Sequence, residues 1–199
     1  MNQNSFEVTN LSTTTLENPN FVKPYRINYT QNKIQKSWEA VKSHDSVSIL
    51  LYHSTKNAFL VVKQFRPPVY VHNNEYPFTY ELCAGIVDKE LSLKQIAQEE
   101  IDEECGYKVT LNQITKINSF FTNVGVSGAK QHLYFAKINE SMKIHDGGGI
   151  NDEQIELEFI SIEKSKEFMY DETKAKTPGL ISAFYWFFEK MSKRDENFC

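Results

Sequence analysis

The chain has 199 residues, of which 40% are hydrophobic and 24% are charged, a composition typical of a folded globular domain. Its net charge of −4, with no run of lysines and arginines, argues against a nucleic-acid binder, because phosphates are neutralised by a clustered basic surface. No apolar stretch approaches the roughly 20 residues that cross a bilayer, and the N-terminus lacks the pattern of a secretory signal. We therefore expect neither nucleic acid nor membrane as a partner.

In chain order, residues 1–20 are polar and rich in Asn, Ser and Thr, which predicts a flexible N-terminal arm. The alternating pattern of residues 21–43 predicts a small β element, with strands at 25–30 and 36–41 around a turn at 31–33. Residues 44–199 are expected to form the main domain. Its strands are predicted at 46–53, 59–65, 80–83, 114–121, 132–138 and 155–161.

The remaining elements of the main domain are loops and two helices. Residues 66–78 hold three prolines and are predicted to form a loop. Ser92 is expected to cap a helix that runs to Cys105 and ends before Gly106. A second helix, with the aromatic run FYWFF, is expected to begin at Pro178 after the N-cap Thr177. This order predicts an α+β fold in which helices cover the faces of a mixed sheet.

The cysteines and histidines suggest no metal or disulfide framework. Cys83, Cys105 and Cys199 form an odd set without a CxxC or cysteine–histidine pattern, which predicts neither disulfides nor a zinc site. Free thiols are typical of a reducing compartment, so we expect a cytoplasmic protein. The five histidines show no ligand spacing and are expected to be structural or exposed.

The segment 85–107, GIVDKELSLKQIAQEEIDEECGY, carries the most specific signal. On a helix with about 100° per residue, an apolar stripe is formed by Leu93, Ile96, Ala97 and Ile101. Glu100 and Glu104 fall within this stripe and Glu103 borders it, although most charge runs are solvated faces. Inward carboxylates one turn apart repel each other, and burial raises their pKa values. A hard divalent cation is the natural counter-charge; the alternative is an ion-pair network with partners elsewhere in the chain.

This segment resembles the Nudix box, the glycine–loop–helix motif of hydrolases that act on nucleoside diphosphates linked to another group. The matching positions are Gly85, Glu100, Ile101, Glu103, Glu104, Gly106 and Tyr107. Leu91 stands at the first glutamate position of the motif, with Glu90 one residue early, and Glu99 stands at the arginine position. In the family these two residues usually pair with each other, so the loss of both leaves neither unpaired.

Nearly the whole chain beyond residue 20 is similar to the UDP-glucose pyrophosphatase branch of that family, which is related to the ADP-ribose pyrophosphatases. The similar stretches are YTQNKIQKSWE, HDSVSILLY, VVKQFRPPVY, ELCAGIVD, EECGY and GGGI. The resemblance implies a Nudix α/β/α sandwich, preceded by a small β element that supports a homodimer and base binding. It also implies hydrolysis of a nucleotide sugar to a nucleoside monophosphate and a sugar 1-phosphate. UDP-glucose is the expected substrate, followed by ADP-ribose and GDP-mannose.

The resemblance further implies which residues bind the metal. Magnesium, for which manganese can substitute, would be held by Glu100, Glu104 and the backbone carbonyl of Ala84. Glu103 would be a third ligand or a catalytic partner through water. The metal would neutralise the diphosphate and make its phosphorus more electrophilic.

A mobile acidic loop before the strand at 155–161 would supply the general base. Glu153 is the first candidate, Glu156 the second and Asp152 the third; the alternative is a plain acidic loop. Arg66, in KQFRPP, would bind a phosphate oxygen, unless it is a surface arginine at a strand end. Trp38 would stack on the nucleobase from the partner subunit, unless it belongs to the core or a dimer interface.

Two functions of other classes stay open at this point. A non-catalytic Nudix-like sensor of nucleotide sugars is suggested by Leu91 and Glu99, although such a sensor would not need all three glutamates of the helix. A structural dimerisation protein is suggested by the aromatic C-terminal helix alone.

Overall fold

The computed structural model describes residues 8–19, 22–150 and 153–192, which fall into two compact units, Met1–Ser43 and His44–Cys199. The first unit contains the antiparallel hairpin of β1 (Lys23–Gln31) and β2 (Ile34–Lys42). Asn32 and Lys33 join the strands with positive φ angles of 52° and 66°. Two consecutive left-handed residues make the tight turn whose twist matches that of the strands. The two predicted strands are therefore present, and each is longer than expected.

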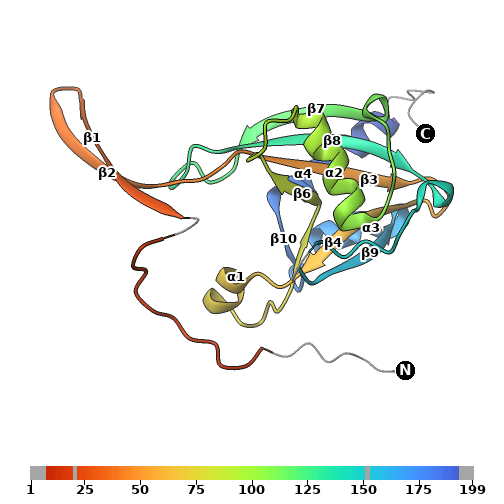
Figure 1. Cartoon of the computed structure of the whole chain (residues 1–199), viewed down its shortest axis with the longest axis horizontal. Coiled ribbons are helices and arrows are strands. Elements are labelled where there is room, and N and C mark those ends of the chain that lie inside the picture. Colours follow the sequence, from red (N-terminus) through yellow and green to blue (C-terminus); the bar gives the residue numbers. More distant parts are fainter. Residues whose placement is uncertain (1–7, 20–21, 151–152, 193–199) are drawn as a thin grey trace. The chain divides into compact units, whose positions relative to one another are not determined.

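The second unit is built on an eight-stranded mixed sheet (Figure 1). Its strands are β3 (Ser46–His53), β4 (Ala58–Gln64), β5 (Thr79–Glu81), β6 (Cys83–Ile86), β7 (Ile114–Phe121), β8 (Lys130–Ile138), β9 (Ile155–Ser161) and β10 (Ala175–Lys176). They follow the order β10-β5-β4-β3-β8-β7, with β6 paired to β3 and β9 paired to β4. β3 runs parallel to β8, and β10 runs parallel to β5. The other paired strands are antiparallel.

Helices cover both faces of this sheet. α2 (Leu93–Cys105) packs on one face, and α3 (Ile162–Tyr170) and α4 (Pro178–Ser192) pack on the other (Figure 1). Alternate residues of β3 divide between the two layers: Ile49 packs on the α2 side, and Leu50 packs with the aromatic residues of α4. Both faces of β3 are buried, which explains its continuous apolar run from Ile49 to Tyr52. The predicted α/β/α sandwich with a mixed sheet is confirmed.

The structure corrects several details of the prediction. Residues 66–78 include the short helix α1 (Pro67–His72), whose two prolines are tolerated because N–H groups of a first helical turn have no partner within the helix. The strand expected at 80–83 is two strands, and β6 continues through Gly85 to Ile86. The sequence patterns also missed α3 and β10.

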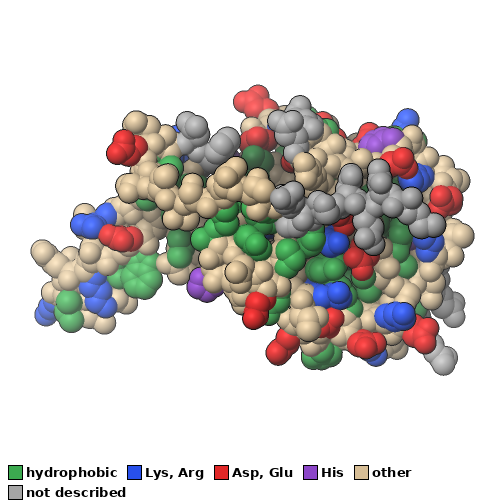
Figure 2. All heavy atoms as spheres, turned by 90° about the horizontal axis from the view of Figure 1, so that it is seen from below, with side chains coloured by type: hydrophobic (Ala, Val, Ile, Leu, Met, Phe, Trp, Pro, Cys, Tyr) green, Lys and Arg blue, Asp and Glu red, His purple; other side chains and the backbone are tan. Residues whose placement is uncertain are grey.

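The described helices and surface bear on possible partners. In the part of the chain that the structure describes, no helix is both long and apolar enough to cross a membrane. On the face drawn in Figure 2, basic and acidic side chains are interspersed rather than gathered by sign.

Candidate active site

The helix α2 begins and ends where the sequence predicts. Ser92 and Gln95 form a capping box, in which the Ser92 hydroxyl accepts from the Gln95 N–H and the Gln95 side chain accepts from the Ser92 N–H. Gly106 ends the helix with a left-handed φ of 74°. A Cβ at this position would lie only 2.8 Å from the Gly147 nitrogen, so the close approach of the following loop also requires glycine.

Glu104 is buried beneath the site, with 7% of its surface exposed. Its Oε2 accepts a hydrogen bond of 2.9 Å from the backbone N–H of Ala84, on β6. Burial raises the pKa of Glu104 to about 8, and repulsion from Glu100 adds to the rise. The N–H of Ala84 and the thiol of Cys83 oppose this rise because they donate to the charged form. A carboxylate is thus held in place where its negative charge is costly.

Glu100 lies one turn earlier on the same face of α2 and rests on Gly85. A Cβ at Gly85 would lie 2.6 Å from the Glu100 Cγ and still closer to the carboxylate, so only glycine fits there. Burial raises the pKa of Glu100 to about 7, and the charge of half-buried Glu103 contributes next. The inward orientation predicted for Glu100 and Glu104 is therefore present. Among the described residues, however, no three His, Cys, Asp or Glu side chains converge closely enough to hold a metal ion by themselves.

Arg66, at the N-terminus of α1, lies within range of the charges of Glu104 and Glu153. Its guanidinium makes a two-pronged pair with Glu81: Nε donates to Oε1 at 2.7 Å and Nη2 donates to Oε2 at 2.9 Å. The bonds to Glu81 raise the pKa of Arg66, and the charges of Glu104 and Glu153 add to this. The Thr79 hydroxyl also donates to Glu81, at 2.6 Å. The pairing fixes the plane of the guanidinium and leaves Nη1 outside the fork.

A groove of about 1450 Å³ adjoins this pair. Its walls come from α1, from the end of α3, the start of α4 and the segment between them, and from Asn123 and Val126 in the loop between β7 and β8. Thr79 forms part of the wall and donates a hydrogen bond to Glu81, so it connects the groove to the Arg66–Glu81 pair. Apolar grooves with a few polar groups are typical of small-molecule sites.

The two acidic candidates for the base differ in their surroundings. Glu153 lies close to the last turn of α2: its carboxylate lies against Gly149, whose N–H donates to the carbonyl of Glu103. Its charge also contributes to the raised pKa values of Glu100 and Glu104. Its Oε2 accepts a hydrogen bond of 3.0 Å from the Ile150 N–H. Glu156 instead faces Lys63 across β4 and β9, with Nζ and Oε2 2.8 Å apart. Asp152, the third candidate, lies outside the described residues.

The two departures from the Nudix box have a structural explanation that sequence reasoning missed. Lys89 in the loop forms a salt bridge with Glu99 on the helix, with Nζ and Oε2 2.8 Å apart. The usual motif has the acidic residue in the loop and the arginine on the helix, so here the two charges have exchanged places. Leu91 packs against the core beneath α2. The sequence did contain a signal for this pair: the loop has a basic residue, Lys89, and the arginine position of the motif has the acidic Glu99.

Trp38 belongs to the first unit, where it lies on β2 directly opposite Ile27 and is half exposed. Tyr25 and Tyr29, on the same face of the hairpin as Ile27, are also exposed. Because directly opposite and alternate residues share a face of a two-stranded sheet, these side chains form one apolar surface.

Proteins similar to this chain act on nucleotides. A uridine diphosphate glucose pyrophosphatase of Bos taurus is 33% identical over 196 residues, which cover 84% of this chain and 88% of that protein. A GDP-mannose pyrophosphatase of Pectobacterium atrosepticum is 32% identical over 127 residues and covers 64% of each chain. The crystal structure of an ADP compounds hydrolase has a TM-score of 0.73 at 12% identity, covers 92% of both chains, and thus shares the fold. No protein-family model matches the chain.

Proposed function

The chain belongs to the Nudix hydrolase family, among its nucleoside diphosphate-sugar pyrophosphatases, and from this premise we propose that it hydrolyses UDP-glucose with the help of magnesium. Water attacks the diphosphate, one phosphorus–oxygen bond of the bridge breaks, and the products are UMP and glucose 1-phosphate. The name of the relative from Bos taurus supports UDP-glucose. GDP-mannose is supported by the bacterial relative, and ADP-ribose by the shared fold with the ADP compounds hydrolase.

One observation carries the metal dependence: Glu100 and Glu104 are packed side by side against the backbone of Ala84 and Gly85, with pKa values raised to about 7 and about 8. Oxygen atoms of these carboxylates and of the Ala84 carbonyl are the donors that a hard cation such as Mg²⁺ prefers. Glu103 would join them directly or through water, and Mn²⁺ would substitute. When bound, the metal supplies the positive charge that neutralises the diphosphate.

The residues of the chain then have distinct tasks. Glu153 accepts a proton from the attacking water, since its carboxylate lies near both glutamates of α2. Arg66 binds a phosphate oxygen, because Glu81 already holds its guanidinium in one plane. The groove beside Thr79 receives the sugar or the nucleoside. Glu156 is the alternative base, but it would first have to leave Lys63.

The exposed apolar face of the hairpin supports a homodimer. A two-stranded hairpin is only marginally stable on its own, and an exposed patch with Trp38 and Ile27 gains by being covered. In the dimer, Trp38 would offer its flat face to the base bound by the partner subunit.

The free, buried thiols of Cys83 and Cys105 are compatible with the reducing cytoplasm.

A screen of UDP-glucose, ADP-ribose and GDP-mannose tests this function, with released monophosphate as the readout. We expect the highest kcat/KM for UDP-glucose in Mg²⁺, partial activity in Mn²⁺ and none in a chelator. Glu100→Gln should be inactive, whereas the control Glu163→Gln, on α3 at the opposite face of the sheet, should match the unmodified protein. Full activity in a chelator would refute the metal dependence, and a preference for another nucleotide would refute the assigned substrate.

A further inference from the structure

The loop 145–149 crosses the C-terminal end of α2. The last carbonyls of a helix have no partner within it and need donors from elsewhere. Here the carbonyl of Glu104 accepts from the Gly148 N–H at 2.8 Å, and the carbonyl of Glu103 accepts from the Gly149 N–H at 3.2 Å. The loop that leads to Glu153 is thus bonded directly to the turn of α2 that carries the glutamates.

The loop also lies in close contact with this turn. Gly147 has a left-handed φ of 70°, and a Cβ there would lie 2.8 Å from the Cys105 carbonyl carbon. Gly149 has a φ of 85°, and a Cβ there would lie 2.5 Å from the Glu153 carboxylate. Glycines give this close approach, but they also leave the backbone conformationally free. The bonds from Gly148 and Gly149 hold the end of the loop, and a further contact is needed to fix the turn at Gly147.

His145 links the loop to α2. Its Nδ1 accepts a hydrogen bond of 3.0 Å from the Gly147 N–H, and its Nε2 lies 2.8 Å from Oδ1 of Asp102. Both contacts are satisfied by the neutral ring with its hydrogen on Nε2, which donates to Asp102. Asp102 lies on the outer side of α2, in the same turn as the three glutamates.

We propose that His145, oriented by Asp102, is a positioning residue that sets the place of the general base Glu153. This inference depends on the proposed role of Glu153. His145 fixes the turn at Gly147, and from this turn the chain proceeds to Ile150, whose N–H holds the Glu153 carboxylate. The carboxylates of Glu100 and Glu104 also have contacts of their own with Gly85 and Ala84, so we expect these two side chains to stay in place when the His145 link is removed.

Three variants at one position separate the contacts of the ring. His145→Ala removes both contacts and should lower kcat about 10- to 100-fold, the effect of misplacing a catalytic group by about 1 Å, with KM and Mg²⁺ affinity unchanged. His145→Asn should recover most of this loss, because its amide oxygen replaces Nδ1 as acceptor for Gly147. His145→Gln reaches toward Asp102 but not toward Gly147, and should resemble His145→Ala. A loss of Mg²⁺ affinity equal to the loss of kcat would overturn the proposal.

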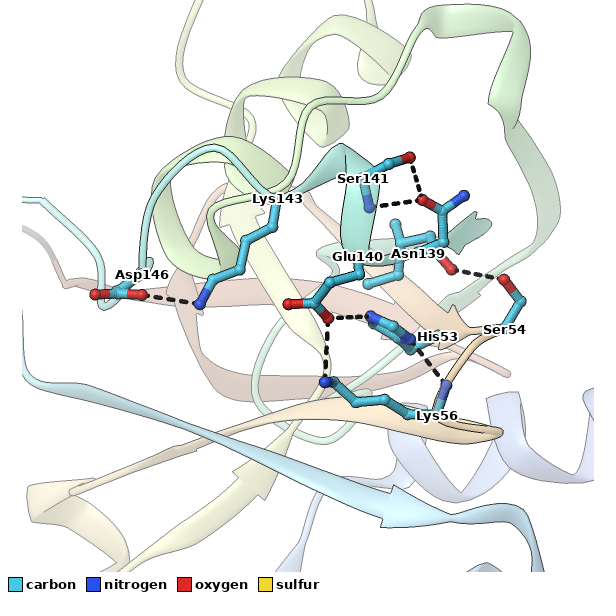
Figure 3. Close-up of polar contacts among 9 residues, drawn as sticks. His53, Ser54, Lys56, Asn139, Glu140, Ser141, Lys143 and Asp146 are labelled. Atoms are coloured by element: carbon cyan, nitrogen blue, oxygen red, sulfur yellow. Dashed lines mark hydrogen bonds and ion pairs between the residues drawn. The ribbon is translucent and has the colours of Figure 1, made fainter.

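The adjacent residue offers a matched control. Asp146 is fully exposed, and its carboxylate pairs with Lys143 at 2.8 Å (Figure 3) rather than with α2. Asp146→Asn should therefore leave kcat unchanged.

A second measurement separates this proposal from the role of Glu153. Amide hydrogen exchange at Gly148 and Gly149 should become faster in His145→Ala and stay the same in Asp146→Asn. Unchanged protection in His145→Ala would overturn the link itself, whatever the function of Glu153. In a Glu153→Gln background, His145→Ala should lower kcat no further, since the group that it positions is gone. If His145→Ala lowers kcat as much in the Glu153→Gln background as it does alone, His145 does not act through Glu153. If the Glu153→Gln single variant is fully active, Glu153 is not the general base.

Discussion

Replacing Glu104 by glutamine should make the metal-free protein more stable at high pH while it abolishes catalysis. The glutamine keeps the size of the side chain and an oxygen that can accept from the Ala84 N–H. It removes the negative charge of a residue that is only 7% exposed and is repelled by the charge of Glu100. The variant therefore separates the cost of burying this charge from the packing of the side chain.

The magnitude follows from the pKa of Glu104, about 8 in the folded protein against an ordinary value of 4.5. The folded protein binds this proton more tightly than the unfolded chain does, so the free energy of unfolding is highest below about pH 4.5 and falls as the pH rises to about 8. At 1.36 kcal/mol per pKa unit, the loss is at most about 5 kcal/mol. For a chain of this size it corresponds to roughly 10–20 °C in Tm. Glu100 contributes in the same direction, with a smaller effect because water screens its half-buried carboxylate.

Thermal unfolding in a chelator, from pH 5 to pH 9, measures this effect. Tm of the unmodified protein should fall across the range, whereas Glu104→Gln should fall less and be the more stable of the two at pH 8.5. Added Mg²⁺ should raise Tm of the unmodified protein most at high pH, where the carboxylates are charged, and should have little effect on the variant. Glu156→Gln is the control, since that exposed carboxylate is paired with Lys63, and it should keep the slope of the unmodified protein. If Tm of Glu104→Gln in the chelator falls with pH as steeply as Tm of the unmodified protein, the buried charge of Glu104 is not the cause of the fall.

Three further predictions concern the substrate. Glu153→Gln should lower kcat by about two to four orders of magnitude with little change in KM, whereas Glu156→Gln should stay within a few-fold of the unmodified protein; kinetics with the opposite outcome would reverse the assignment. Arg66→Lys should raise KM about tenfold or more, because an ammonium lacks the planar fork; an unchanged KM would mean that Arg66 serves only to hold Glu81. Trp38→Ala should weaken dimerisation and raise KM, and light scattering that finds the unmodified protein to be a fully active monomer would exclude the dimer.

The helix that carries the three glutamates, α2, could be predicted because its properties are local. The helical period alone places Glu100 and Glu104 on the apolar stripe, and Ser92 and Gly106 bound the helix through contacts within a few residues. The strands were found by the same kind of local pattern. The limits of that approach appear at α1, where the three prolines of residues 66–78 suggested a loop although two of them occupy the first turn of a helix. They also appear at the split between β5 and β6, which depends on the strands beside them.

Periodicity in the amino-acid order was thus sufficient for the mixed α+β architecture and the orientation of the glutamates, and the resemblance of several segments to known proteins was sufficient for the sandwich and the family. The partners of the polar groups could not be predicted in this way, because they lie 10 to 43 residues apart, beyond the reach of a local pattern. Arg66 meets Glu81, Lys89 meets Glu99, and His145 meets Asp102 from 43 residues away. Only the packing of β4, β5, β6 and α2 brings such groups within hydrogen-bonding distance, and burial among them, rather than residue type, raises the pKa of Glu104.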